Sequence, residues 1–318
     1  GARRLLVIYG DRDPGDVIHK MNTRKDKYDI SGKVHIREGE EKIHAMMEDY
    51  EGVIIWDLPS QIRNKYLKYC FSHSIRCYMS PKISDIILLG TDRIHLFDTP
   101  LLMCRNQGLS MEQRAAKRLL DIVVSGLGII VSSPIMLIIA IAVKAYDGGP
   151  VFYLQDRLTY KGKEFRIRKF RSMCVDSEKN GARLASKHDS RITPVGHVLR
   201  NLHLDELPQL FNVFVGDMSL VGPRPERDVI MQEYEQEIPE FHYRLKVKAG
   251  LTGYAQVYGK YNTTPYDKLK LDLFYIENYS FLLDIKLLFM TVKIFFQKEV
   301  SEGVDDDQKN ALKDSQDK

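Results

Sequence analysis

The feature that most limits the possible folds of this 318-residue chain is an uncharged run from Ile122 to Val143. Arg114, Lys117 and Arg118 precede the run, and Lys144 follows it. At about 1.5 Å per residue, a straight helix of this length would cover about 33 Å, enough to cross the hydrocarbon of a bilayer. Because a buried helix of a soluble protein rarely runs this long without a polar face, we expect the run to contact a membrane.

The middle and the flanks of this run argue against a simple crossing. Ser133 and Pro134 lie near its centre, and a proline removes a backbone donor and kinks a helix. Basic residues flank both ends, whereas a spanning helix usually has a basic bias on one side only. We therefore predict a re-entrant membrane helix that breaks at Ser133 and Pro134. Both of its ends would lie on the cytosolic side, and serine hydroxyls would bond some of the freed backbone groups.

Residues 3–103 alternate short apolar runs with helical patterns. Residues 5–10, 52–59 and 74–79 are each typical of a strand, and residues 60–72 are typical of a helix. Strands that alternate with helices indicate βαβ units and a parallel sheet, so we predict an α/β, Rossmann-like domain. The phosphate-binding pattern G-x-G-x-x-G is absent, which favours a structural or regulatory module over a working cofactor site.

Charge and cysteine content exclude some classes of protein. A net charge of +4 and a pI of about 8.7 are too mild to indicate nucleic acid, and we predict no nucleic-acid partner. The four cysteines are scattered without metal-ligand spacing, which indicates reduced thiols and soluble parts that face the cytosol. The polar stretch at residues 305–318 is expected to be disordered. Residue 1 is Gly, so we expect further residues before it in the natural protein.

A strongly basic segment begins at Gln155. Its seven cations would suit an anionic substrate or an anionic lipid surface, although a solvated basic strand is the more common meaning of such a composition. The seven are Arg157, Lys161, Lys163, Arg166, Arg168, Lys169 and Arg171.

Asp205 and Glu206 are adjacent carboxylates just before Pro208, where a helix is expected to begin. On this pattern alone, capping of the helix is the more common role. The alternative is chemical, because two adjacent carboxylates repel unless a cation neutralises them or one is protonated. A divalent ion, a carboxylate nucleophile and free helix N–H groups would together make a phosphoryl-transfer centre.

Pro223, Arg224 and Pro225 form a Pro-Arg-Pro sequence. The two prolines restrict the backbone on either side of a guanidinium that is suited to bidentate phosphate contact, although a rigid turn would account for the same pattern. The histidines do not form a zinc signature, and G-x-S-x-G, P-loop and kinase patterns are absent, so hydrolase and kinase functions lose ground.

Several further segments follow one another in a characteristic order. They are KRLLDIV from Lys117, the Ser133–Pro134 pair, KFRSM from Lys169, DSRITPVGHVLRN from Asp189, LDELPQLFNV, GDMSLVGPRPE, AGLTGYAQVYG from Ala249 and DLFYIENYS from Asp272. This ordered set, which covers about residues 117–291, resembles the bacterial sugar transferases known as monotopic phosphoglycosyl transferases. Residues 3–103 resemble the nucleotide-binding-like domain of the larger members. The resemblance reverses the preference for a simple helix cap at Asp205.

The resemblance implies a two-step reaction. Asp205 would attack the β-phosphate of a UDP-sugar, release UMP and hold a covalent phospho-sugar, which undecaprenyl phosphate would then accept. Glu206 would help to hold Mg²⁺. The resemblance further implies a homodimer at the cytoplasmic face of the bacterial inner membrane, at the start of a cell-surface glycan pathway such as capsule or exopolysaccharide. Neither the sugar nor the pathway is specified by the sequence.

The matched motifs also indicate which residues bind the substrate. Arg200 matches a phosphate-contacting arginine, and the Pro-Arg-Pro sequence matches a motif tied to the nucleotide end of the substrate. The full expected set is Lys169, Arg171, Arg191, Arg200, Gln209, Pro223, Arg224 and Pro225.

The expected domains are a degenerate Rossmann-like domain at 1–103, a linker at 104–116 and the re-entrant helix at 117–146. A small α+β catalytic domain with amphipathic surface helices follows at 147–304, before the tail at 305–318. An alternative from another class is a non-catalytic scaffold or regulator that binds nucleotide-sugars through residues 3–103. A weaker alternative is a metal-dependent phosphohydrolase.

Overall fold

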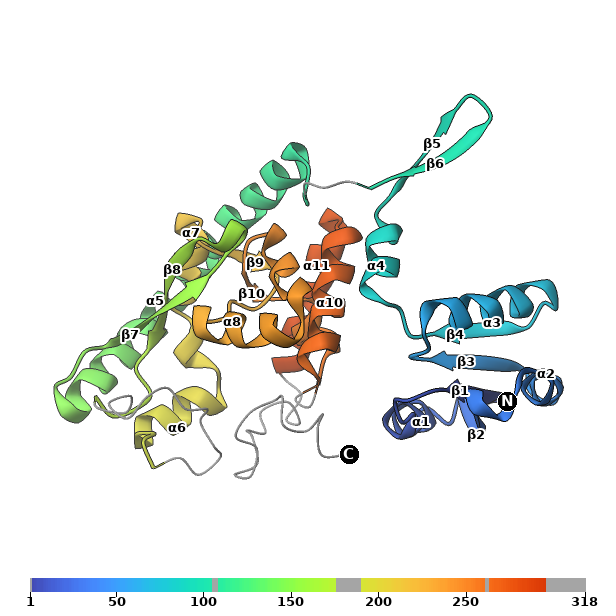
Figure 1. The fold of residues 1–318 in the computed structure, drawn as a ribbon. Coiled ribbons are helices and arrows are strands. Elements are labelled where there is room, and N and C mark those ends of the chain that lie inside the picture. Colours follow the sequence, from blue (N-terminus) through green and yellow to red (C-terminus); the bar gives the residue numbers. More distant parts are fainter. Residues whose placement is uncertain (1, 105–107, 176–189, 261–262, 296–318) are drawn as a thin grey trace. The chain divides into compact units, whose positions relative to one another are not determined.

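The computed structural model describes residues 2–104, 108–175, 190–260 and 263–295 (Figure 1). It divides the chain into two compact units, Gly1–Asp85 and Ile86–Lys318, so the division comes earlier than the expected domain boundary at residue 103. The expected tail, 305–318, lies outside the described residues, as does part of the expected linker.

The first unit is built on a parallel sheet with the strand order β2-β1-β3-β4, which confirms the parallel sheet predicted from the sequence. Its elements in chain order are β1 (Arg3–Tyr9), α1 (Gly15–Asn22), β2 (Tyr28–His35), α2 (Glu40–Met47), β3 (Gly52–Trp56), α3 (Ser60–Ser72) and β4 (Arg76–Met79). Helix α4 (Ile83–Leu89) begins in this unit and ends in the next.

Both faces of this sheet are buried. Successive side chains of β1 point to opposite faces, so Leu6 and Ile8 enter one apolar core while Leu5 and Val7 enter the other. A strand buried on both faces has a nearly continuous apolar sequence, which explains why β1 and β3 were predictable. Strand β2 was not predicted, because polar residues separate its two buried positions, Ile30 and Val34.

The second unit combines small two-stranded sheets with helices (Figure 1). Antiparallel pairs join β5 (Asp92–Leu96) to β6 (Thr99–Met103) and β7 (Phe152–Leu158) to β8 (Glu164–Phe170), whereas β9 (Ser219–Val221) and β10 (Gly250–Thr252) pair in parallel. The helices are α5 (Met111–Asp147), α6 (Pro194–Asn201), α7 (Gln209–Val215), α8 (Asp228–Glu237), α9 (Tyr254–Tyr258), α10 (Pro265–Glu277) and α11 (Phe281–Phe295). The β5–β6 hairpin was not predicted.

Helix α5 contains the uncharged run and is longer than the run itself. Its start carries a reciprocal capping box between Ser110 and Gln113, and Gly148 ends it in the left-handed conformation. Only 17% of its most apolar 18-residue window is buried, and Ile130 and Val131 are exposed by 70% and 77%. By length and composition, α5 is the one helix of the described residues that could cross a membrane. Exposed apolar residues on this scale mark a surface that contacts something other than water.

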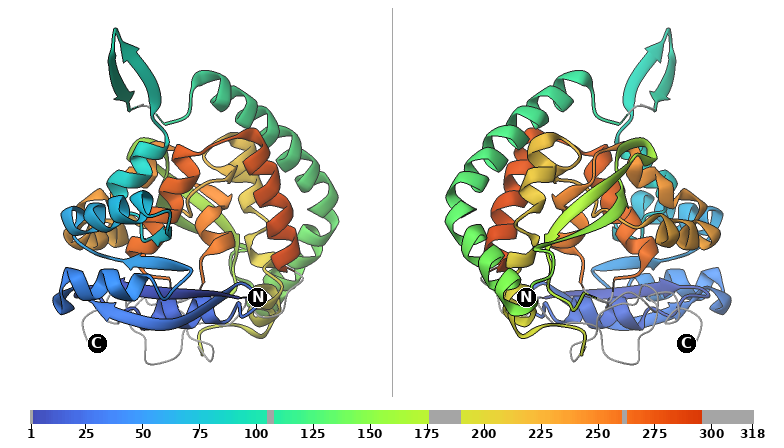
Figure 2. Two further views of the ribbon diagram at one scale, coloured as in Figure 1. Left: turned by 90° about the vertical axis from the view of Figure 1, so that its right-hand side faces the viewer. Right: turned by 90° about the vertical axis from the view of Figure 1, so that its left-hand side faces the viewer.

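Ser133 and Pro134 do not interrupt α5, which is continuous from Met111 to Asp147 and follows a curved path (Figure 2). Pro134 has no N–H to donate to the carbonyl of Ile130, four residues earlier. The Ser133 hydroxyl donates to this same carbonyl at 2.8 Å, and Ser132 donates to the carbonyl of Gly128 at 2.6 Å. The prediction that a serine hydroxyl bonds a freed backbone group is therefore confirmed for Ser133, whereas the predicted break of the helix at Ser133 and Pro134 is wrong, because α5 continues through both residues.

Candidate active site

Asp205 and Glu206 lie on a single 3-10 turn, Leu204–Glu206, immediately before α7. His203 precedes the turn with φ 53°, a left-handed conformation that is uncommon for a residue other than glycine. Helix α7 has Pro208 at its N-cap position and no capping bond from that side chain. A residue that simply capped α7 would lie at the N-cap position, and the acid pair lies before that position.

Two cations from distant parts of the chain meet at Glu206. Lys169, on β8, donates from Nζ to Glu206 Oε1 at 2.7 Å. Arg224, which follows β9, donates from its guanidinium to the same oxygen at 3.2 Å. Burial raises the pKa of the Glu206 carboxyl, but the charges of Arg224 and Lys169 outweigh burial and hold that pKa well below its usual range. Glu206 is therefore ionised throughout the neutral range.

Asp205 lies in a different environment, although it is the adjacent residue. It is only 9% exposed. Burial, followed by the neighbouring charge of Glu206, raises the pKa of Asp205 against the opposing charges of Lys169 and Arg200. Environments that push the pKa values of two neighbouring carboxyls apart are typical of catalytic pairs with divided roles.

The expected phosphate-contacting arginine, Arg200, lies in the last turn of α6. Its Nε donates to Ser172 Oγ at 2.9 Å, just beyond the end of β8. The start of α6 is packed tightly against the same residue, since a Cβ at Gly196 would lie 1.9 Å from the Ser172 carbonyl oxygen. Ser172 and Gly196 thus fix the direction of Arg200, and neither was singled out from the sequence.

Arg171 is the residue directly after β8, and it does not lie at the acid pair. It is 7% exposed, and its guanidinium pairs with Asp147 at the end of α5 and donates to the carbonyl of Pro150 at 2.7 Å. These contacts join the end of α5 to the chain that enters β7. The geometry therefore gives Arg171 a supporting position rather than a free guanidinium.

The remaining expected residues differ in burial and in the elements that carry them. Gln209 is 3% exposed in the first turn of α7, and Arg191 lies just before α6. Pro223 and Pro225 are both buried, whereas Arg224 between them is exposed. The Pro225 carbonyl accepts from Arg157 at 3.1 Å. The Pro-Arg-Pro sequence thus presents one guanidinium from a backbone that is anchored on both sides.

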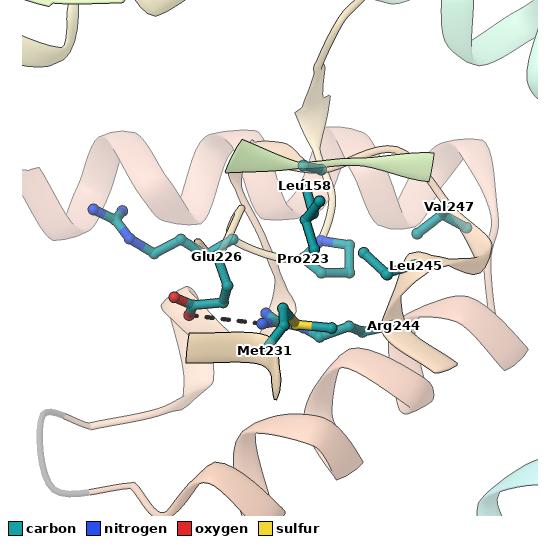
Figure 3. A pocket seen from close by; sticks show the side chains of 9 residues that line it. Leu158, Pro223, Glu226, Met231, Arg244, Leu245 and Val247 are labelled. Atoms are coloured by element: carbon teal, nitrogen blue, oxygen red, sulfur yellow. Dashed lines mark ion pairs between the residues drawn. The ribbon is translucent and has the colours of Figure 1, made fainter. Parts of the chain in front are cut away.

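A small, solvent-open pocket adjoins this turn (Figure 3). Leu158, Pro223 and Val247 contribute apolar side chains, and Glu226 pairs with Arg244 at 3.6 Å along one side. Arg244 is 5% exposed and also pairs with Asp272 at 2.8 Å. The pocket is therefore mixed in character, apolar on one side and ionic on the other.

Asn212 is a structural residue of the site that the sequence did not reveal. It is fully buried on α7, and its side-chain amide accepts from the backbone N–H of Arg168 at 3.0 Å and donates to the Arg166 carbonyl at 2.8 Å. This pair of bonds fixes α7 against β8, which carries Lys169. A polar side chain on the apolar face of a predicted helix was the available signal.

The acid pair can be tested against the requirements of Mg²⁺. Within the described ranges, no three His, Cys, Asp or Glu side chains form a metal cluster. Mg²⁺ is usually held by only one or two carboxylates, with phosphates and water completing its shell. The adjacent carboxylates of Asp205 and Glu206 therefore fit a Mg²⁺ ion that is bound together with a phosphate substrate.

The chain belongs to the bacterial sugar transferase family, whose model matches residues 112–298, within the second unit. The chain is 44% identical to a UDP-N-acetylgalactosamine-undecaprenyl-phosphate N-acetylgalactosaminephosphotransferase of Aeromonas hydrophila, over 56% of this chain and 43% of that protein.

Two other relatives carry names with different sugars. A UDP-glucose:undecaprenyl-phosphate glucose-1-phosphate transferase of Escherichia coli is 40% identical over 91% of this chain and 61% of its own length. An undecaprenyl-phosphate galactose phosphotransferase of Salmonella typhimurium is 37% identical over 69% of this chain and 49% of its own length. The chain thus spans about half the length of the curated relatives it matches.

Proposed function

We propose that this protein transfers a sugar-1-phosphate from a UDP-sugar to undecaprenyl phosphate. The observation that carries the proposal is the meeting of Lys169, Glu206 and Arg224, which come from three separate segments, beside the buried carboxyl of Asp205. Membership of the bacterial sugar transferase family supports the reaction class. The relatives' names contain glucose, galactose and N-acetylgalactosamine, so the donor is proposed only as a UDP-sugar of the hexose or N-acetylhexosamine class.

In the first step, a carboxylate oxygen of Asp205 attacks the β-phosphorus of the donor. The new bond is an acyl phosphate, and the bond that breaks joins the β-phosphorus to the bridging oxygen, which leaves with its electron pair as part of UMP. Asp205 must be ionised to attack. Lys169 and Arg200 oppose the increase in its pKa, which keeps more of the nucleophile charged.

In the second step, a phosphate oxygen of undecaprenyl phosphate attacks the same phosphorus. The acyl phosphate bond breaks, the Asp205 carboxylate is restored and the product is the lipid diphosphate sugar. Arg224 and Lys169 are placed to offset negative charge on the transferring phosphoryl group. Mg²⁺, held by Glu206 with the phosphates, would neutralise further charge on these oxygens.

The proposed setting is the cytoplasmic face of a bacterial inner membrane, with α5 as a re-entrant helix. The exposed apolar face of α5 and the basic residues at both ends support this arrangement. Cysteines introduced one at a time at Glu112 and Lys163, in a background without native cysteines, should react only from the cytosolic side of intact cells. Opposite accessibility would contradict the re-entrant arrangement.

The first unit is proposed to be a degenerate Rossmann-like module without a catalytic role. Its strand order β2-β1-β3-β4 and parallel pairing support this fold. The competing idea is that this unit binds nucleotide-sugars for a regulatory purpose. If the isolated unit showed a nucleotide-dependent increase in melting temperature, the regulatory idea would gain support.

The direct test is an assay of UMP release by the purified protein in lipid nanodiscs with a panel of UDP-sugars. We expect release that requires Mg²⁺ and that continues beyond one equivalent of enzyme only with undecaprenyl phosphate. Free sugar phosphate in solution without lipid acceptor would indicate a hydrolase instead. Absence of UMP with every donor would favour the non-catalytic scaffold.

A further inference from the structure

The base of α5 contacts the segment that separates the acid pair from Arg224. Arg118 donates to the carbonyls of Val213 and Phe214, both at 2.7 Å, and these lie at the end of α7. One turn further along α5, Asp121 Oδ1 accepts from the Leu220 backbone N–H at 2.9 Å and from Ser219 Oγ at 3.0 Å. A single face of α5 therefore holds both the end of α7 and the start of β9.

A third residue of α5 extends this contact to the end of β9. Lys117 donates to Asp284 at 2.6 Å and to the Tyr275 hydroxyl at 2.9 Å. That hydroxyl also lies 3.3 Å from the carbonyl oxygen of Val221 and 2.6 Å from Asp284 Oδ1. The side chains of Lys117, Asp121 and Asp284 are all at least nine-tenths buried, so solvent does not weaken these charged hydrogen bonds.

Backbone proximity also ties α7 to α5. A Cβ at Gly128 would lie 3.2 Å from Leu210, and one at Gly126 would lie 3.4 Å from Phe214. The absence of side chains at these two glycines lets α7 approach α5 closely. Since α7 directly follows the acid pair, the position of α5 sets the position of Glu206 from one side.

We infer that Asp121 is a positioning residue for Arg224. Through Asp121, the position of α5 determines whether Arg224 is held in contact with Glu206. The inference rests on the proposed function for its kinetic consequences, but its geometry is independent of them. The carboxylate of Asp121 accepts from the N–H of Leu220, four residues before Arg224, and Asp121 is only 2% exposed. Without this acceptor, the N–H and the Ser219 hydroxyl lose their partner, β9 shifts, and the guanidinium moves away from Glu206.

The kinetic test compares Asp121→Ala and Asp121→Asn with the unaltered protein in nanodiscs. Asp121→Ala should raise the KM for the UDP-sugar about tenfold, because Arg224 would no longer be held in place for the donor. Asp121→Asn keeps an oxygen that accepts from the Leu220 N–H, so it should recover most of this loss. A lower melting temperature with unchanged KM in Asp121→Ala, or equal loss in both variants, would overturn the inference.

A double-mutant cycle separates positioning from general damage. If Asp121 acts through Arg224, Asp121→Ala should add little to the KM of Arg224→Ala, and the two effects will be strongly non-additive. Additive effects would overturn the inference. Asp85→Ala is the matched control, since Asp85 pairs with Arg63 in the first unit and should leave KM unchanged.

Hydrogen exchange gives a readout that does not need turnover. In Asp121→Ala, peptides that cover residues 219–226 should exchange faster, and Asp121→Asn should restore most of the protection. Faster exchange confined to Leu220, with no effect on 222–226, would contradict transmission to Arg224. If the unaltered protein released no UMP but the exchange result held, the proposed function would fail while the positioning role remained.

Discussion

Asp205 and Glu206 are adjacent residues whose pKa values are shifted in opposite directions. Glu206 is stabilised in its charged form by Lys169 and Arg224, whereas Asp205 is buried beside the charge of Glu206. Lys169 and Arg224 both donate their hydrogen bonds to Glu206 and not to Asp205. In the proposed mechanism, the buried and less stabilised carboxylate of Asp205 is the nucleophile, and Glu206 is the carboxylate that would hold Mg²⁺.

Replacement of Lys169 by methionine should shift the acidic limb of the pH profile of kcat/KM to higher pH. The ammonium of Lys169 opposes the increase in the pKa of Asp205, so its loss raises that pKa further. Less of the nucleophile is then ionised at a given pH, and the shift should be about one pH unit. Lys163→Met, which alters an exposed lysine just before β8, is the control. A profile of unchanged position in Lys169→Met would contradict the electrostatic role.

Asp205→Asn should make the protein more stable at neutral pH while it abolishes turnover. A carboxyl whose pKa is raised by folding costs stability once it is ionised. This cost is absent below the unfolded-state pKa and grows as pH rises through the folded-state pKa. At neutral pH the asparagine variant avoids the cost, so we expect an increase in Tm of about 2–4 °C. The gain should shrink near pH 4, and a gain that was largest at low pH would contradict the assignment.

At the scale of the elements, α5 has two different kinds of surface along its length. Its first three turns make charged contacts with α7, β9, α10 and α11, through Lys117, Arg118 and Asp121. From about Gly126 onward it exposes apolar side chains. Arg118 and Asp121, three residues apart on α5, each bond to the backbone of a neighbouring segment.

The pairing of Ser133 with the freed Ile130 carbonyl predicts a dependence between two substitutions. Ser133→Ala should lower stability by about 1 kcal/mol, because it leaves that carbonyl without a donor in an apolar setting. In a Pro134→Ala background the backbone N–H returns to the same carbonyl, so Ser133→Ala should then cost almost nothing. Thermal unfolding in nanodiscs of the two single variants and the double variant measures this coupling. Equal costs in both backgrounds would show that the hydroxyl has no such role.

Elements with strong apolar patterns were predictable, and those held by tertiary contacts were not. The sequence predicted β1, β3, α3 and the long helix because each has an apolar run or a clear period. It missed β2 and the β5–β6 hairpin, where polar residues interrupt the pattern. Asp205 and Glu206 were expected at or just before the start of a helix, and the structure places them on a separate 3-10 turn before α7.

The residues of the site were predictable to the extent that chemistry demands them. Charge and proline context made Asp205, Glu206 and Arg224 candidates, the family resemblance favoured them over a helix cap and a rigid turn, and the structure brings Glu206 and Arg224 into contact. The supporting residues Asn212, Ser172 and Asp121 act through bonds to backbone or to other side chains far along the chain. No local pattern records such long-range bonds, so these residues could not be recognised from the sequence.

At the scale of the whole molecule, all the proposed site residues lie in the second unit, as does the family match at 112–298. The first unit has apolar cores of its own. Activity is therefore expected to depend on the second unit alone.

Deletion of residues 1–85 should leave the KM for the UDP-sugar within about twofold of the full chain, a free-energy difference of roughly 0.4 kcal/mol. The shortened and full-length proteins would be compared in the same nanodiscs, with circular dichroism to establish that the remaining unit is folded. A folded but inactive remainder would assign the first unit a direct part in catalysis.

The central claim is that Asp205 carries the sugar phosphate as a covalent intermediate. The most direct measurement is mass spectrometry of the protein after incubation with Mg²⁺ and a competent UDP-sugar in the absence of lipid acceptor. We predict a mass increase of one sugar phosphate, located on the peptide that contains Asp205, absent from Asp205→Asn and removed by undecaprenyl phosphate. UMP release with no adduct on that peptide, or an adduct that persists in Asp205→Asn, would contradict the account.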